Sequence, residues 1–166
     1  MSLSCLLAAG CSPALDWREV RPAGTALVVT MPCRPAATER SLTLAGQAVR
    51  MSMHSCKASD LTWAVAHADV GEPAKVAPAL RSLRDGMVAN LRAEVVDAAA
   101  AAVRGATPNG AHERVRLRGS KPDGAVASGQ FVVFSHGTRV YQATVLGTAV
   151  PAEAAETFFE SLRLGT

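Results

Sequence analysis

Residues 61–91 read LTWAVAHADVGEPAKVAPALRSLRDGMVANL and contain both kinds of element from which the fold is built. In the first ten residues apolar and polar side chains alternate, with Leu61, Trp63 and Val65 on one side, which predicts a strand with one buried face. In the remainder, apolar side chains recur every three or four positions, which predicts an amphipathic helix over residues 74–92. The stretch therefore predicts a helix that packs across a sheet.

Strand patterns continue on both sides of this stretch. Pro151 is typical of a first helical turn, and Phe158 and Phe159 follow it on the expected buried stripe of a closing helix. Residues 93–110 are ambiguous because the valines favour a strand whereas five consecutive alanines favour a helix, and we expect a strand or irregular structure around Val95–Val96. The predicted strands are Ala26–Met31, Ser41–Leu44, Gln47–Cys56, Leu61–Val70, Arg114–Arg118, Gly129–Ser135 and Thr138–Gly147.

Length and order of elements predict one α+β domain over residues 25–166, with an antiparallel sheet flanked by two or more helices. The chain has 166 residues, which leaves no room for two full domains. Its apolar content comes largely from Ala and Val, since it has only four Phe, two Trp and one Tyr. A stacking platform for nucleic acid is therefore not expected, and a net charge of +3 does not indicate a polyanionic partner.

The closing helix ends in Phe158-Phe159-x-Ser161-Leu162-Arg163. Together with the order of elements over residues 16–164, this pattern resembles the PsbP-like α/β/α sandwich of bacterial lipoproteins of unknown function. The resemblance implies a fold and transfers no activity.

The N-terminal segment resembles the lipobox of bacterial lipoproteins. Leu7, Ala8, Ala9 and Gly10 lead directly into Cys11, and the apolar run is far shorter than the roughly 20 residues of a spanning helix. The resemblance implies a signal peptide over residues 1–10, lipid on Cys11 and a tether over residues 11–24. No Lys or Arg precedes Cys11, which a start assigned too far downstream would explain. The alternative is an apolar cytosolic N-terminus.

This assignment predicts a domain held in the periplasm by an N-terminal lipid, with the membrane as its first partner. An envelope protein is an open second partner. Ser12 stands where some inner-membrane lipoproteins carry Asp, and this weakly favours the outer membrane. If Cys5 leaves with the signal, Cys33 and Cys56 remain, and two cysteines in an oxidising compartment are expected to pair. Two buried free thiols are the alternative.

Motifs for catalysis are not evident. Ser135 and His136 are neighbours, and neighbours on an extended chain point to opposite faces, so we interpret Ser135-His136-Gly137 as a hairpin turn. No cofactor is expected. The weak metal candidate is a copper set of imidazole and sulfur ligands, which a disulfide would remove. Its members are His54, Cys56, Cys33 and Met31.

Arg114, Arg116 and Arg118 alternate along one predicted strand and so share a face. They fit contact with anionic headgroups at a membrane surface, or alternatively a charged strand edge that resists pairing.

Three functions therefore remain, in this order. The first is a non-enzymatic, lipid-anchored binding or scaffold module of the cell envelope. The second is a carrier of a small ligand or copper, which a pocket lined by His54 or Tyr141 would favour. The third is an envelope enzyme whose site is assembled from distant residues such as His67, His112 and Asp69.

Overall fold

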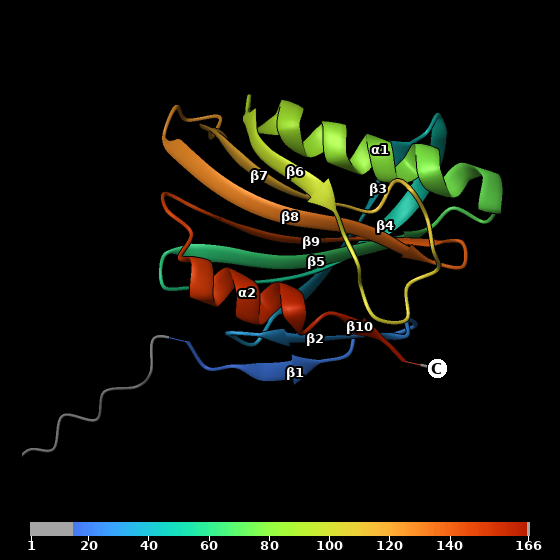
Figure 1. Cartoon of the computed structure of the whole chain (residues 1–166), viewed down its shortest axis with the longest axis horizontal. Helices are drawn as coiled ribbons and strands as arrows, with labels where there is room; N and C mark the ends of the chain where they lie inside the picture. The colour runs from blue at the N-terminus through green and yellow to red at the C-terminus, as the bar shows by residue number, and fades with distance from the viewer. Residues whose placement is uncertain (1–14, 166) are drawn as a thin grey trace, which may run out of the picture.

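The structure is a computed structural model that describes residues 15–165. Its strands form two antiparallel sheets, and two helices pack against the larger one (Figure 1). In chain order the elements are β1 (Arg18–Val20), β2 (Leu27–Met31), β3 (Ala36–Leu44), β4 (Gln47–Ala58), β5 (Leu61–Asp69), α1 (Pro73–Asn90), β6 (Glu94–Ala100), β7 (Glu113–Ser120), β8 (Val126–His136), β9 (Arg139–Gly147), α2 (Ala152–Glu160) and β10 (Arg163–Leu164).

The larger sheet has seven strands in the order β3-β4-β5-β9-β8-β7-β6. Tight turns join several neighbours, as expected for an antiparallel sheet. The turn between β3 and β4 places Ala45 at φ 49° and Gly46 at φ 79°. Two successive left-handed residues match the right-handed twist of the flanking strands, and Gly46 adopts this conformation without a steric penalty.

The two faces of this sheet are covered differently, as Figure 1 shows. Helix α1 covers one face, which we call the α1 face. Buried Leu80 and Leu83 of the helix contribute there to the same core cluster as Val115 and Phe131 of the sheet. Helix α2 and the three-stranded sheet cover the opposite face, which we call the α2 face.

The smaller sheet has the order β1-β2-β10 and is closed by a strand from near the end of the chain. Leu164 of β10 pairs with Leu27 of β2, and the Thr30 amide donates to the Ser161 hydroxyl at 2.8 Å. Leu27, Val29 and Met31 of β2 are buried in the core cluster of the α2 face. This sheet therefore forms a second β layer.

The predicted α/β/α sandwich is wrong. Strands hold 50% of the described residues and helices 18%, and the architecture is a β-rich sandwich. Much of the α2 face is covered by the three-stranded sheet, where an α/β/α sandwich would place helices. Sequence reasoning missed this layer because β1 and β10 are only three and two residues long, and no periodic pattern can develop over such lengths.

Most individual elements are confirmed. The helix expected over residues 74–92 is α1, the closing helix is α2, and the strand expected around Val95 is β6. The alanines at positions 98–100 belong to this strand, since Ala98 pairs with Val115 of β7. Pairing with β7 overrides their helix propensity.

The described part of the expected tether, residues 15–24, lies against the domain. β1 pairs with β2, with Glu19 opposite Thr30, and the Asp16 amide donates to the Pro32 carbonyl at 2.9 Å. Trp17 packs edge-on against Trp63 with ring centroids 5.7 Å apart. Residues that the sequence assigned to a tether thus help to build the second β layer.

Candidate functional site

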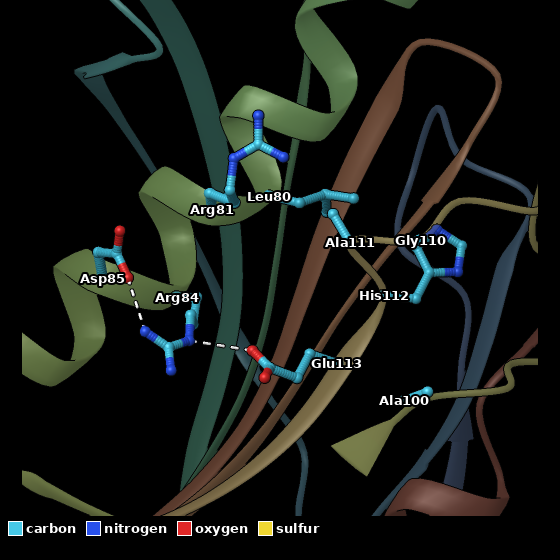
Figure 2. A pocket seen from close by; sticks show the side chains of 9 residues that line it. All are labelled: Leu80, Arg81, Arg84, Asp85, Ala100, Gly110, Ala111, His112 and Glu113. Carbon is cyan, nitrogen blue, oxygen red and sulfur yellow. Dashed lines mark hydrogen bonds and ion pairs between the residues drawn. The ribbon is translucent and has the colours of Figure 1, made fainter. Parts of the chain in front are cut away.

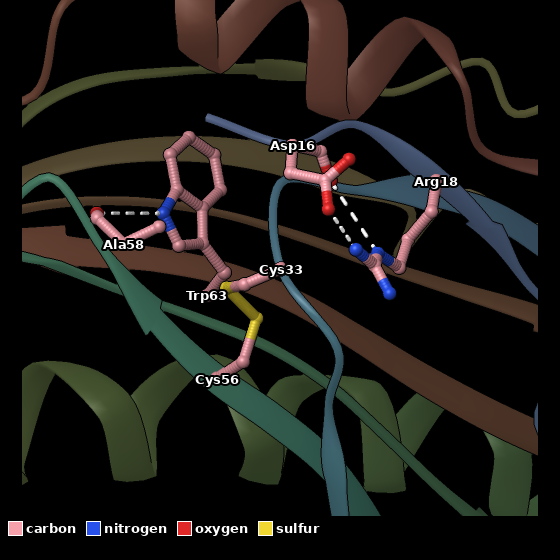
Figure 3. The surroundings of a disulfide bond; sticks show 6 residues. All are labelled: Asp16, Arg18, Cys33, Cys56, Ala58 and Trp63. Atoms are coloured by element: carbon pink, nitrogen blue, oxygen red, sulfur yellow. Dashed lines mark hydrogen bonds and ion pairs between the residues drawn. A yellow bond between two sulfur atoms is a disulfide. The ribbon is translucent and has the colours of Figure 1, made fainter. Parts of the chain in front are cut away.

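Cys33 and Cys56 form a disulfide that links the two β layers (Figure 3). Cys33 follows β2 of the small sheet, whereas Cys56 lies in β4 of the large sheet, and their Cα atoms are 6.0 Å apart. Trp63 lies directly opposite Cys56 in the strand register and is completely buried, as predicted for a core tryptophan. The expected pairing of the two cysteines is confirmed.

The candidate copper set does not assemble. The sulfur atoms of Cys33 and Cys56 are bonded to each other, and the side chain of Met31 is fully buried in the apolar core. His54 lies on the α2 face, and no cluster of three or more His, Cys, Asp or Glu side chains in the described part of the chain could hold a metal ion. The disulfide removes the thiolates that would have been the strongest ligands.

The three arginines of β7 share the α2 face, but two of them are held by carboxylates. Arg114 donates to Glu156 of α2 at 2.6 Å and lies over the Phe159 ring, while Arg116 pairs with Asp97 of β6 at 3.2 Å. Arg118 has no ion-pair partner among the described residues. Because β7 pairs with β6 and β8, these arginines do not guard a sheet edge.

A polar cluster interrupts the apolar α2 face. The rings of His54 and His67 stack with centroids 6.1 Å apart, and His67 lies opposite Tyr141 in the register of β5 and β9. An Arg139 guanidinium N–H donates to His67 Nδ1 at 3.3 Å, and the same guanidinium lies 3.6 Å from the Asp69 carboxylate. The fold thus unites residues proposed for two different functions, and it adds Arg139, which sequence reasoning missed.

Burial controls the ionisation of this cluster. Burial first, and the charge of Arg139 second, lower the pKa of His67 from 6.5 to about 4, so His67 is neutral at neutral pH. Its Nδ1 accepts from Arg139, which leaves the proton on Nε2, and Nε2 is buried without a hydrogen-bond partner among residues 15–165. Hydrogen bonds from Gly71 and Thr138 lower the pKa of Asp69. Neither of the two hollows described below is lined by His67.

His112 forms a second buried pair that the sequence did not reveal. The Ser135 amide donates to His112 Nε2 at 3.0 Å, and the Ser135 hydroxyl lies 2.9 Å from the same nitrogen. Ser135 is 1% exposed. His136, its neighbour in sequence, instead has Nδ1 3.0 Å from the Gly105 carbonyl oxygen beside the turn into β9. Ser135 and His136 thus have different partners, as alternation along a strand predicts.

These contacts fasten the long segment between β6 and β7 to the end of β8. The Thr107 amide donates to the Ser135 carbonyl at 2.9 Å, and the Gly137 amide donates to the Thr107 hydroxyl at 2.9 Å. The segment also reaches the small sheet, where the Leu164 amide donates to the Arg104 carbonyl at 2.8 Å. His112 therefore anchors a structured connection, and it makes no hydrogen bond to His67 or Asp69.

A groove of about 480 Å³ lies between α1 and the beginning of β7 (Figure 2). Helix α1 supplies Arg81 and Arg84 along one side, and Ala100, Ala111 and His112 border the other. Arg84 bridges two carboxylates, with Nη1 2.9 Å from Asp85 and Nε 3.0 Å from Glu113.

The charges in the groove are held in place. The hydrogen bond to Asp85 is the main cause of a raised pKa for Arg84, so its guanidinium remains protonated. Burial lowers the pKa of His112 and favours its neutral form. The groove therefore presents the fixed guanidinium group of Arg84 beside the neutral imidazole of His112.

A smaller and more apolar hollow of about 360 Å³ lies beside Leu15, Trp17 and the beginning of α2. No helix in the described part of the chain is long and apolar enough to cross a membrane. Cys11 and the lipobox-like sequence before it lie outside the described residues.

No model of a known protein family matches this chain, and no curated protein sequence matches it either.

Proposed function

We propose that this chain is the extracytoplasmic binding domain of a lipid-anchored bacterial envelope protein. The disulfide between Cys33 and Cys56 carries the proposal, because stable disulfides form in oxidising compartments and are rare in the bacterial cytosol. The lipobox-like sequence before Cys11 supplies the corresponding anchor. Leu15 and Trp17 lie against the folded domain, so only Ser12, Pro13 and Ala14 would separate a lipid on Cys11 from the body of the protein.

Two observations support binding over catalysis by the groups described above. The Ser135 hydroxyl is buried against His112, and a nucleophile in that position has no access to a substrate. His67 is only 5% exposed, and its Nδ1 accepts a hydrogen bond from Arg139 on the same sheet face. His67 and His112 therefore make hydrogen bonds within the folded domain. The groove beside α1, by contrast, is accessible to a ligand.

Expression in a bacterium from an upstream start tests the anchor and the disulfide together. We expect mass spectrometry of the mature protein to find Cys11 at its N-terminus with acyl chains attached, and we expect Cys33 and Cys56 to resist alkylation until a reductant is added. Cys11→Ala should abolish lipid incorporation. The matched control is Cys5→Ala, which should leave it unchanged, because Cys5 is expected to leave with the signal.

The proposal fails if the isolated protein carries an unmodified Cys11 and retains residues 1–10. It also fails if Cys33 and Cys56 of protein taken directly from cells react with the alkylating agent before reduction.

A further inference from the structure

We infer that the groove beside α1 binds a small ligand bearing a compact oxyanion, that is, a carboxylate or phosphate group. The inference deepens the proposed binding role by naming the site and the chemistry that it would recognise. It depends on which hydrogen-bond donors in the groove already have partners and which do not.

The two carboxylates of the groove are both engaged by one guanidinium. Arg84 donates through Nη1 to Asp85 and through Nε to Glu113, and this bridge fixes the position of the guanidinium between α1 and β7. The remaining nitrogen, Nη2, has no partner within the described residues. An acceptor that enters the groove therefore meets an oriented donor whose ordering cost has already been met by the fold.

His112 supplies a second donor by a tautomer argument. Its Nε2 must accept, because a backbone amide can only donate and the Ser135 amide points at it from 3.0 Å. A neutral imidazole with an accepting Nε2 carries its proton on Nδ1. His112 is 7% exposed and lines the groove, and Nδ1 has no hydrogen-bond partner over residues 15–165. The donor is thus nine-tenths buried and still unused.

Arg81 supplies the charge. It is exposed on α1 one turn before Arg84, at the rim of the groove, and it has no ion-pair partner among the residues that the structure describes. The two guanidinium groups and the two carboxylates of the groove balance in charge. Both carboxylates pair with Arg84, so Arg81 is the charged group that is left unpaired. Charge-assisted hydrogen bonds to an oxyanion are about twice as strong as neutral ones.

The size of the groove also fits a small ligand. A volume of about 480 Å³ falls within the range of roughly 300–1,000 Å³ that small-molecule sites occupy. The unused donors of Arg84, His112 and Arg81 match the acceptor oxygens of a carboxylate or phosphate group.

Amide NMR spectra of the chain with Cys11→Ser, titrated separately with citrate and with inorganic phosphate, test the inference. We expect saturable shifts at Gly110, Ala111 and His112 in at least one titration. A response to citrate alone identifies a carboxylate ligand, and a response to phosphate alone identifies a phosphate ligand. Arg81→Gln should weaken the affinity about tenfold or more, because it removes the unpaired charge.

Arg40→Gln is the matched control, because Arg40 is also exposed and without a described partner but lies on β3. It should change the affinity less than about twofold. The inference is overturned if neither anion gives saturable shifts in the groove, or if Arg81→Gln binds as tightly as Arg40→Gln. The lipid assay is independent of this titration, so failure of one proposal is distinguishable from failure of the other.

Discussion

The two faces of the seven-stranded sheet are filled with different kinds of side chain. The core on the α1 face is almost entirely aliphatic, with Phe131 as its single buried aromatic residue among those described. The core on the α2 face contains Trp63, Phe134, Tyr141 and Phe158, and it also holds the disulfide and the buried imidazole of His67.

This difference follows from what covers each face. One long helix with a regular apolar stripe covers the α1 face, and branched aliphatic side chains fill the space beneath it. Several separate pieces of chain meet the α2 face, namely α2, the small sheet, the residues before β1 and the segment that follows β6, and large rings fill the irregular spaces between them (Figure 1). The α2 face contains the disulfide, which responds to reductant, and His67, whose pKa is the most strongly lowered of the described histidines.

The largest expected effect comes from removing a buried side chain, and it can be compared between the cores of the two faces. Trp63→Ala should lower the free energy of unfolding by about 4 kcal/mol, because Trp63 is fully buried and packs edge-on against Trp17 and Phe158. Leu80→Ala on the α1 face should cost about 3 kcal/mol, since fewer atoms are removed. Urea denaturation measures both, and a larger loss for Leu80→Ala would break the comparison.

Acid should destabilise the protein through the α2 face. His67 is neutral when folded and has a pKa of about 4, whereas an unfolded histidine binds a proton near pH 6.5. The unfolded state therefore binds more protons between these values, so the stabilising contribution is complete above pH 6.5 and falls by up to about 3 kcal/mol as the pH drops to 4.

Unfolding free energies measured between pH 7 and pH 4 check this expectation. His67→Gln should flatten the dependence relative to the unsubstituted protein. Some slope should persist in His67→Gln because burial also lowers the pKa of His54 and of His112. An unaltered slope in His67→Gln would contradict the role given to this imidazole.

The smallest expected effect is at the margin of the α2 face, on β7. Arg116 and Asp97 form an ion pair whose side chains are 55% and 58% exposed. Solvent screens such a pair, so Arg116→Gln should change the free energy of unfolding by less than about 1 kcal/mol. A loss comparable to that of Trp63→Ala would show that this margin belongs to the core.

The α1 face was the easier one to predict from sequence. The three- and four-residue spacing of Val76, Leu80 and Leu83 predicts α1, and the alternation around Trp63 predicts β5, because both patterns reflect burial along one continuous element. The strands β1 and β10 lack such a pattern, since they are specified by their pairing with β2.

The polar sites needed information that sequence does not contain. His67 and Arg139 are 72 positions apart, and His112 and Ser135 are 23 apart. They meet only because of strand register, which depends on turn lengths and on the opposite strand. The disulfide was accessible to prediction because two remaining cysteines allow a single pairing.

The order of β1, β2 and β10 has a consequence for how the chain is made. Residues 27–31 obtain one of their two neighbouring strands only from residues 163–164. During synthesis from the N-terminus, the inner strand of the small sheet therefore keeps one edge open until residues 163–164 have been made. A chain halted before Arg163 would leave that edge unpaired, a defect that quality-control proteases and chaperones could recognise.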